Sequence, residues 1–91
     1  MLDLRFTSKF EKDYKLIKKR NYDISKLKTV VLMLRNREQL PAKYLDHALN
    51  GKYTGYRECH IEPDWLLVYK IEDENLILTL IRTGTHSDLF G

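Results

Sequence analysis

Residues 56–71 have the sequence YRECHIEPDWLLVYKI, in which two strand-like runs flank the turn tripeptide Glu62-Pro63-Asp64. A third run, Leu76 to Arg82, is nearly all apolar and follows a polar loop over 72–75. Short spacers of this kind join antiparallel neighbours. We therefore predict a three-stranded antiparallel meander, with the last run as a central strand covered on both faces or mostly so.

The residues before the meander predict one strand and two helices. Apolar residues alternate with charged ones over 2–6, which indicates a short strand with one buried face. Ser8 with Glu11 three residues later matches a capping box for a first helix, and a second helix is expected from about Ser25 to Asn36, capped by Asp23 or Ser25. Their expected buried residues are Phe10, Tyr14 and Ile17 on the first helix and Ile24, Leu27, Val31 and Leu34 on the second.

The order of these elements predicts an α+β fold. The turn at 20–23 is short enough to join the helices as an antiparallel αα-hairpin, which can cover one face of a sheet. Neither helical nor strand period persists from Pro41 to about Gly55, so this stretch is expected to be a loop. With 91 residues and no linker or repeat, residues 1–91 are expected to form a single domain.

The net charge of +3 conceals two unlike halves. Residues 1–45 carry 12 Lys and Arg against 5 Asp and Glu, a net +7, and the remainder is −4. A basic half attracts polyanions over about a Debye length, although a solvated pair of Lys-rich helices would give the same count. The expected basic surface of the first helix consists of Lys12, Lys15, Lys18, Lys19 and Arg20.

Cysteine content and hydropathy indicate a cellular compartment. A single cysteine cannot form an internal disulfide, which favours a reducing environment. No apolar run approaches the ~20 residues of a membrane span, and the alternating N-terminus does not resemble a signal peptide. We therefore expect a cytoplasmic protein with no membrane partner.

All three histidines lie in the second half of the chain. Strand alternation places His60 on one face of its strand with Glu58 and Glu62, Asp64 is in the adjacent turn, and His86 follows the last strand. The direction of the loop residue His47 does not follow from the pattern. Taken singly, a histidine is more often a residue of the surface or of the core edge than a catalytic one.

Together, histidines suggest acid–base chemistry on a phosphodiester. Imidazoles on opposite sides of the phosphate could act as base and acid, while Arg57 or Arg82 supplies positive charge to the phosphate oxygens. This arrangement would cleave RNA through the neighbouring 2′-hydroxyl without a metal.

Other chemistries are less favoured by the spacing. Cys59 and His60 are adjacent and point to opposite strand faces, and no paired ligand spacing exists, so no metal or cofactor is expected. Glu58 and Glu62 are interpreted as exposed charge. Trp65 and several tyrosines could stack on bases, but alternation favours packing for Trp65 and Tyr69.

Three blocks of sequence, Asp46–Gly51, Gly55–Tyr69 and Arg82–Phe90, resemble the YafQ branch of the RelE/ParE toxin superfamily. The resemblance covers essentially the whole chain. It implies a RelE-like fold, in which an N-terminal strand and a two-helix hairpin pack on an antiparallel sheet completed by the C-terminal meander.

This resemblance also implies a function. Such toxins belong to type II toxin–antitoxin systems and are mRNA interferases, endoribonucleases that cut mRNA in the ribosomal A site and are neutralised by an acidic, DinJ-like antitoxin. The matching positions imply catalytic roles for His47, His60, Asp64 and His86, with His60 or His47 as base and His86 as acid toward the 5′-oxygen. The matching positions also imply that Phe90, Trp65 and Arg82 lie at the substrate. By its charge, Arg57 would contact substrate as well, and the basic residues of the first helix would face ribosomal RNA.

Two other functions remain compatible with the sequence. A ParE-like toxin shares the fold but acts by binding gyrase without catalysis, which leaves the histidines unexplained. A small basic RNA-binding module would use the lysines and be indifferent to His47, His60 and His86.

Overall fold

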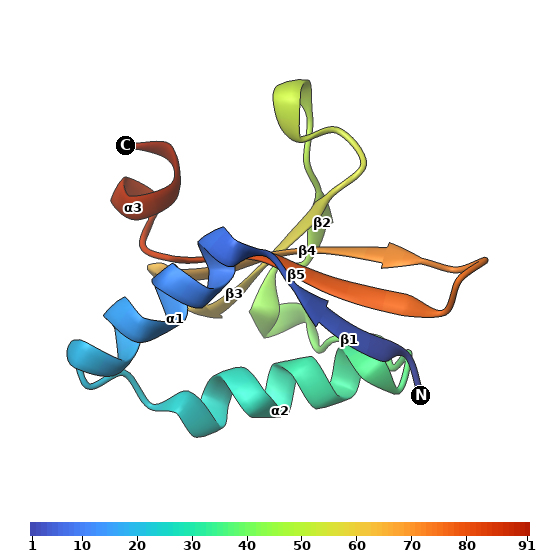
Figure 1. Ribbon diagram of the computed structural model, residues 1–91, viewed down its shortest axis with the longest axis horizontal. Helices are drawn as coiled ribbons and strands as arrows, with labels where there is room; N and C mark the ends of the chain where they lie inside the picture. Colours follow the sequence, from blue (N-terminus) through green and yellow to red (C-terminus); the bar gives the residue numbers. More distant parts are fainter.

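The computed structural model describes residues 1–91 as a five-stranded sheet with three α-helices (Figure 1). The strands are β1 (Asp3–Phe6), β2 (His47–Ala48), β3 (Arg57–Glu62), β4 (Trp65–Glu72) and β5 (Ile77–Gly84). The helices are α1 (Ser8–Lys19), α2 (Ile24–Arg35) and α3 (His86–Phe90), with 3₁₀ turns at Ala42–Tyr44 and Gly51–Tyr53. No helix has the length and apolar character that a membrane crossing requires.

The strand order β1-β5-β4-β3-β2 confirms the predicted meander, since β3, β4 and β5 are antiparallel neighbours. β5 lies between β4 and β1, so it is an interior strand as expected. β1 pairs with β5 in parallel. The connection between them is long and contains α1, α2 and the strands β2 to β4.

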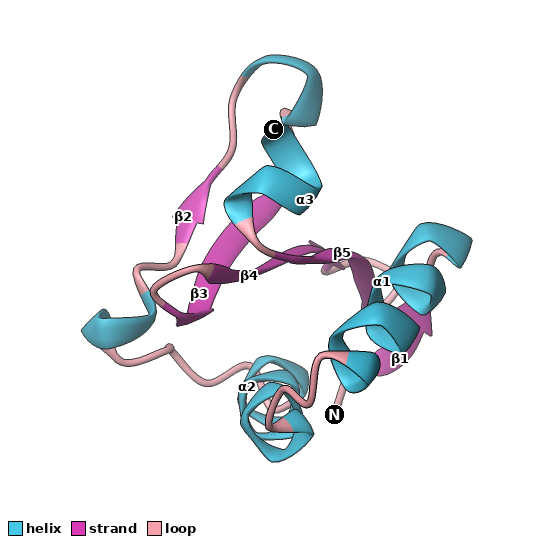
Figure 2. Cartoon of the chain, turned by 90° about the vertical axis from the view of Figure 1, so that its left-hand side faces the viewer, coloured by secondary structure: helices cyan, strands magenta, loops and turns pink.

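The sheet separates two layers of unequal depth (Figure 2). α1 and α2 cover one face, where the main core gathers around the odd-numbered residues of β4, which include Trp65, Leu67 and Tyr69. The second face carries a small core of Leu66, Val68 and Leu89 beneath α3. α1 and α2 bury their predicted stripes, with Ile24 and Tyr14 only partly buried.

Two local predictions differ from the structure. Thr7 rather than Ser8 caps α1, its hydroxyl accepting from the Phe10 amide at 3.0 Å. Residues 41–55 are not wholly irregular, because His47–Ala48 form β2 and pair with β3. A strand of two residues is too short to show a period, so alternation cannot reveal it.

α1 also protects the edge of β5 beyond the end of β1. The Thr7 hydroxyl donates to the Ile81 carbonyl at 2.7 Å, and the Thr83 amide donates to Asp13 at 3.1 Å. These bonds satisfy backbone groups that an exposed edge would leave open to another strand.

Candidate active site

The strand register brings four residues into one row across the second face of the sheet. His47 lies opposite Glu58, Glu58 opposite Val68, and Val68 opposite Arg82. Directly opposed residues share a face, so a histidine, a carboxylate and an arginine lie on one surface with a valine between them. The loop residue His47 therefore joins the site through β2.

A second row on the same face contains His60, Leu66 and Gly84. His86 follows Gly84 by two residues and opens α3. The His60 ring centroid is 6.4 Å from that of His47 and 5.6 Å from that of His86. The three imidazoles thus form a line with His60 in the middle.

Glu58 lies beneath two of these histidines. One carboxylate oxygen, Oε1, is 3.6 Å from His47 Nε2 and 3.7 Å from His60 Nε2, and the side chain is only 7% exposed. The sequence interpretation of Glu58 as exposed charge is therefore wrong. Strand alternation places Glu58 on the face of His60, and that is the signal in the sequence for its role.

Glu62 does not share this face. The register of β3 and β4 shifts between His60 and Glu62, and the Glu62 carboxylate instead pairs with Lys26 on α2. A bulge redirects the side chains that follow it, so strict alternation fails at this point.

Each imidazole uses Nδ1 for an oxygen acceptor. The Nδ1 of His47 is 2.9 Å from the Leu45 carbonyl, that of His60 is 3.3 Å from the Pro63 carbonyl, and that of His86 is 2.6 Å from Asp64 Oδ1. A carbonyl or carboxylate oxygen only accepts, so in these bonds Nδ1 carries the proton. Nε2 is the second nitrogen of each ring, and on His47 and His60 it faces Glu58 Oε1.

Asp64 holds His86 by two bonds to the same oxygen. Oδ1 accepts from the His86 backbone amide at 2.9 Å and faces the ring nitrogen at 2.6 Å. The backbone amide, followed by the ring, lowers the pKa of Asp64 from its usual range. Asp64 is therefore ionised at neutral pH and stabilises a positive charge on the His86 ring.

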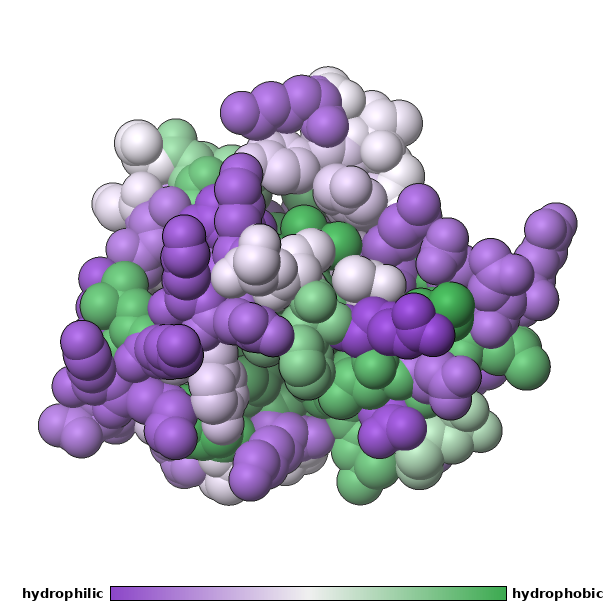
Figure 3. Space-filling model, viewed as in Figure 1, coloured by the Kyte–Doolittle hydropathy of each residue, from purple (hydrophilic) through white to green (hydrophobic).

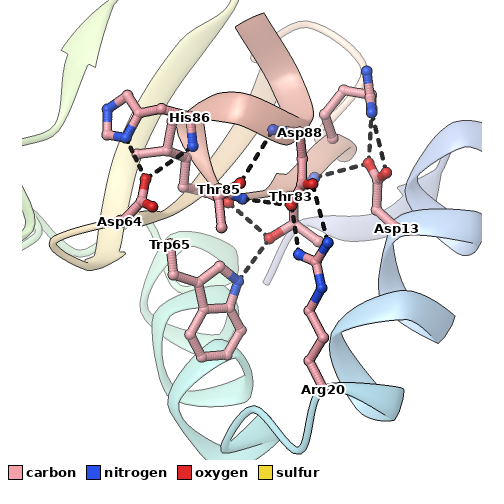
Figure 4. Close-up of polar contacts among 10 residues, drawn as sticks. Asp13, Arg20, Asp64, Trp65, Thr83, Thr85, His86 and Asp88 are labelled. Atoms are coloured by element: carbon pink, nitrogen blue, oxygen red, sulfur yellow. Dashed lines mark hydrogen bonds and ion pairs between the residues drawn. The ribbon is translucent and has the colours of Figure 1, made fainter. Parts of the chain in front are cut away.

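A polar network fixes α3 and so the position of His86 (Figure 4). Asp88 accepts from Arg20 at 2.7 and 3.2 Å and from the Thr85 amide at 2.9 Å, while the Asp88 amide donates to the Thr85 hydroxyl at 3.1 Å. These bonds hold the pKa of Asp88 at about 2, chiefly through Arg20. Gly84 has φ +149°, and a Cβ there would lie 2.8 Å from Asp88 Oδ2, so the approach to α3 requires glycine.

Arg82 reaches the site because of a second bulge. Leu80 pairs with Tyr69 and Arg82 with Val68, so one extra residue of β5 turns Arg82 to the histidine face. Asp13 holds the guanidinium at 2.7 and 3.1 Å through Nε and Nη2, which raises the pKa of Arg82. A guanidinium has five N–H groups, so Nη1 is available for a further acceptor.

Three aromatic side chains from α3 and from the segment between β2 and β3 lie next to one another. Phe90 on α3 is 47% exposed and lies edge-on to Tyr53, with ring centroids 5.7 Å apart. Tyr53 in turn lies 6.3 Å from Tyr56. The resemblance pointed to Phe90, and Tyr53 is one of the tyrosines that the sequence offered for stacking on bases, although its loop position carries no periodic signal.

Several predicted contacts with substrate or ribosome are not at this surface. Arg57 lies on the helix side of β3 and binds Asp46 at 2.8 and 3.2 Å. Trp65 is 1% exposed and donates to Thr83 at 2.9 Å, so it is a packing residue. Arg20 is held by Asp88, whereas Lys12, Lys15, Lys18 and Lys19 are exposed on α1.

The remaining nucleophile or ligand candidates do not assemble. No group of three His, Cys, Asp or Glu side chains is arranged to hold a metal ion. Cys59 is fully buried, and burial raises the pKa of its thiol to about 12. A buried neutral thiol is a packing group and not a nucleophile.

Comparison with known proteins places this site in a family. Residues 2–91 match the family described as the bacterial toxin of type II toxin-antitoxin system, YafQ. The chain belongs to the YafQ family. The mRNA interferase toxin YafQ of Escherichia coli strain K12 is 47% identical over 90 residues, covering 98% of this chain and 96% of that protein.

Solved structures of YafQ proteins share the fold. The crystal structure of YafQ from E. coli strain BL21(DE3) is 44% identical, with a TM-score of 0.92 and complete coverage of both chains. The toxin in the crystal structure of the E. coli DinJ-YafQ complex is 46% identical, with a TM-score of 0.90 over the full length of both chains. The RelE-like fold predicted from the sequence is confirmed.

Proposed function

We propose that this YafQ-family toxin is an mRNA interferase, an endoribonuclease that cuts mRNA on the ribosome. The supporting observation is the line of three imidazoles on one sheet face, each with Nδ1 within hydrogen-bond distance of an oxygen, so that Nε2 is the nitrogen left for proton transfer. The E. coli relative carries the name mRNA interferase.

The first half of the proposed reaction uses the Glu58 end of the line. Nε2 of His47 or His60 accepts the proton of the RNA 2′-hydroxyl, and the freed oxygen forms a bond to phosphorus. The imidazolium produced lies within 4 Å of the buried Glu58 carboxylate, which stabilises its charge. Glu58 can stabilise the imidazolium of either histidine, because both Nε2 atoms lie at similar distances from the same oxygen.

The second half uses His86. As the bond between phosphorus and the 5′-oxygen breaks, Nε2 of the protonated His86 donates a proton to that oxygen. The products are a 2′,3′-cyclic phosphate and a free 5′-hydroxyl. Asp64 assists because its ionised carboxylate favours the charged, proton-donating form of His86.

Two further groups would hold the RNA. Arg82 lies in the row of His47 and Glu58 and can donate through Nη1 to a phosphate oxygen, where negative charge builds up. The exposed face of Phe90, supported by Tyr53, offers a surface on which a base can stack.

The ribosome and an acidic antitoxin are the proposed partners. The lysines of α1 provide a phosphate-binding surface. In E. coli, YafQ forms a complex with DinJ. A groove of about 670 Å³ between α1, α2 and β1 contains exposed Phe6 and Leu32 and is rimmed by Lys15, Lys28 and Arg35, which suits an amphipathic acidic segment (Figure 3).

Primer extension on a translated mRNA, with and without ribosomes, tests the nuclease. Wild-type protein should cut only the translated message, and His86→Ala should remain folded but cut about 10²–10⁴ times more slowly. Ser87→Ala, an exposed neighbour on α3, is the matched control and should cut normally. Full activity of His86→Ala would remove His86 from the mechanism, and equal cutting of naked RNA would contradict ribosome dependence.

A further inference from the structure

His47 has weak backbone support for a residue of the proposed active site. β2 has only two residues and lies at the edge of the sheet, where it pairs with β3 alone. The flanking segments are 3₁₀ turns and loops, and the His47 side chain is 50% exposed. Edge pairing this short is marginal by itself, so other contacts must fix the imidazole.

The residue before His47 is firmly held on the opposite face of the sheet. Oδ2 of Asp46 accepts from Arg57 Nη2 at 2.8 Å and from Nε at 3.2 Å, and Oδ1 accepts from the Tyr69 hydroxyl. Arg57 and Tyr69 are cross-strand partners on β3 and β4. Asp46 is thus anchored to two interior positions of the sheet.

At neutral pH the Arg57 guanidinium is charged and the Tyr69 hydroxyl keeps its proton, so both can donate to Asp46. Asp46 raises the pKa of the Arg57 guanidinium, and burial followed by Asp46 raises the pKa of the Tyr69 hydroxyl above its usual value. The Tyr69 side chain is buried and the Asp46 carboxylate is only 24% exposed, so the hydrogen bond between them is partly shielded from water, whereas the Arg57 side chain is 44% exposed.

The anchor at Asp46 determines where His47 points. Successive residues of an extended chain face opposite sides of a sheet, so holding Asp46 on the helix side directs His47 to the side of Glu58 and His60. Leu45 is in the left-handed region with φ +49°, and its carbonyl accepts a hydrogen bond from His47 Nδ1 at 2.9 Å. The ring is thereby held by its chain neighbours on one side and faces Glu58 with Nε2 on the other.

We infer that Arg57 and Tyr69 are positioning residues for the reaction, acting through Asp46 to hold His47 against Glu58. This inference rests on the proposed nuclease function. It gives Arg57 a role on the face of β3 opposite the site, where it does not contact the scissile phosphate. A displacement of about 1 Å in a catalytic group can cost 10²-fold in rate.

The test compares Tyr69→Phe and Arg57→Gln with the wild type. Both variants should lower the single-turnover rate of cleavage on saturating ribosomes by about tenfold or more, with the half-saturating ribosome concentration unchanged. Arg57→Lys, which keeps one donor, should recover part of the rate. Glu74→Gln, which removes an exposed charge in the turn between β4 and β5, is the control and should match the wild type.

A double variant separates positioning from general destabilisation. When His47→Ala has already removed the imidazole, adding Tyr69→Phe should cause no further loss of rate, because nothing remains to be positioned. A further tenfold loss in the double variant, or wild-type rates for both Tyr69→Phe and Arg57→Gln, would overturn the inference.

Nitrogen NMR of the imidazoles tests the geometry without RNA cleavage. In the wild type, the His47 signals should show a proton on Nδ1, and in Tyr69→Phe and Arg57→Gln they should shift toward a mixture of tautomers while those of His86 stay fixed. If wild-type protein cuts no RNA but these shifts occur, the nuclease proposal fails and the positioning of His47 stands. Unchanged His47 signals in both variants would contradict the positioning.

Discussion

At the scale of single residues, the site depends on which imidazole nitrogen carries the proton. Chain neighbours fix Nδ1 of His47 and His60 through the Leu45 and Pro63 carbonyls, and Asp64 fixes Nδ1 of His86. The three imidazoles therefore differ in the carboxylate that lies nearest to them. Two imidazoles face a shared carboxylate oxygen, and the third has a carboxylate of its own.

Glu58→Gln tests the shared carboxylate. The amide keeps the shape of the side chain but removes its negative charge, so an imidazolium at His47 or His60 loses its nearest counter-charge. We expect cleavage on the ribosome to fall about 10²-fold, the magnitude associated with one electrostatic contact in a transition state, with little change in the thermal midpoint.

Glu62→Gln is the matched control for that substitution. It makes the same chemical change at the end of β3, where the carboxylate pairs with Lys26 at an exposed position. Its cleavage rate should equal that of the wild type, since exposed pairs contribute little. Equal losses of cleavage rate in Glu58→Gln and Glu62→Gln would show that the rate depends on the net charge of the protein and not on the position of Glu58.

At the scale of elements, the five-residue helix α3 carries His86 and is too short to be stable by itself. Its stability comes from Leu89 in the second core, from the Thr85–Asp88 capping box and from the Arg20–Asp88 pair. The cation that follows α1 therefore helps to position the last helix.

Asp88→Asn should reveal this anchor through its pH dependence. The pKa of Asp88 is about 2 in the folded chain and about 3.9 in an unfolded one, so its ionised form stabilises the fold above about pH 4 and this contribution disappears as the pH falls toward 2. At pH 7 a destabilisation of about 1 kcal/mol would lower the thermal midpoint by about 4–8 °C.

The difference in midpoint between wild type and Asp88→Asn should then shrink between pH 4 and pH 2. Calorimetry or circular dichroism melts at several pH values measure it. Asp3→Asn, on the exposed side of β1, is the control and should show no such trend. A difference that is independent of pH would mean that ionisation of Asp88 does not hold α3.

At the scale of the whole molecule, the basic residues and the histidines lie in different halves of the chain. The basic half supplies α1, whose lysines are exposed, while the acidic half supplies the sheet face with the three histidines. Of the carboxylates near the histidines, Glu58 is buried beneath two imidazoles and Asp64 contacts the third.

Salt dependence of ribosome binding tests the role of α1. The double variant Lys12→Gln/Lys19→Gln should bind more weakly, and its slope of log affinity against log salt should fall by about 0.7–0.9 for each phosphate that the variant no longer neutralises. Lys43→Gln/Lys70→Gln removes the same charge elsewhere and should keep the wild-type slope. Equal changes in both variants would indicate attraction by net charge without a defined surface.

The sequence predicted what depends on local pattern. Alternation and turn residues indicated the meander, helical spacing indicated α1 and α2, and alternation on the first meander strand placed His60 with Glu58. The recognisable blocks from Asp46 to Phe90 indicated the family. Each of these features is decided by residues a few positions apart, and spacing in the chain then corresponds to direction in space.

Long-range register decided the rest. The pairing of β2 with β3 brings His47 beside Glu58. One bulge turns Glu62 away from the histidine face, and the other turns Arg82 toward it. The folded sheet places Arg57 on the face opposite the histidines. A two-residue strand or a bulge has no period of its own, because its position is set by the partner strand. The sequence therefore determined which groups this toxin has for catalysis, and the tertiary structure decided which of them meet.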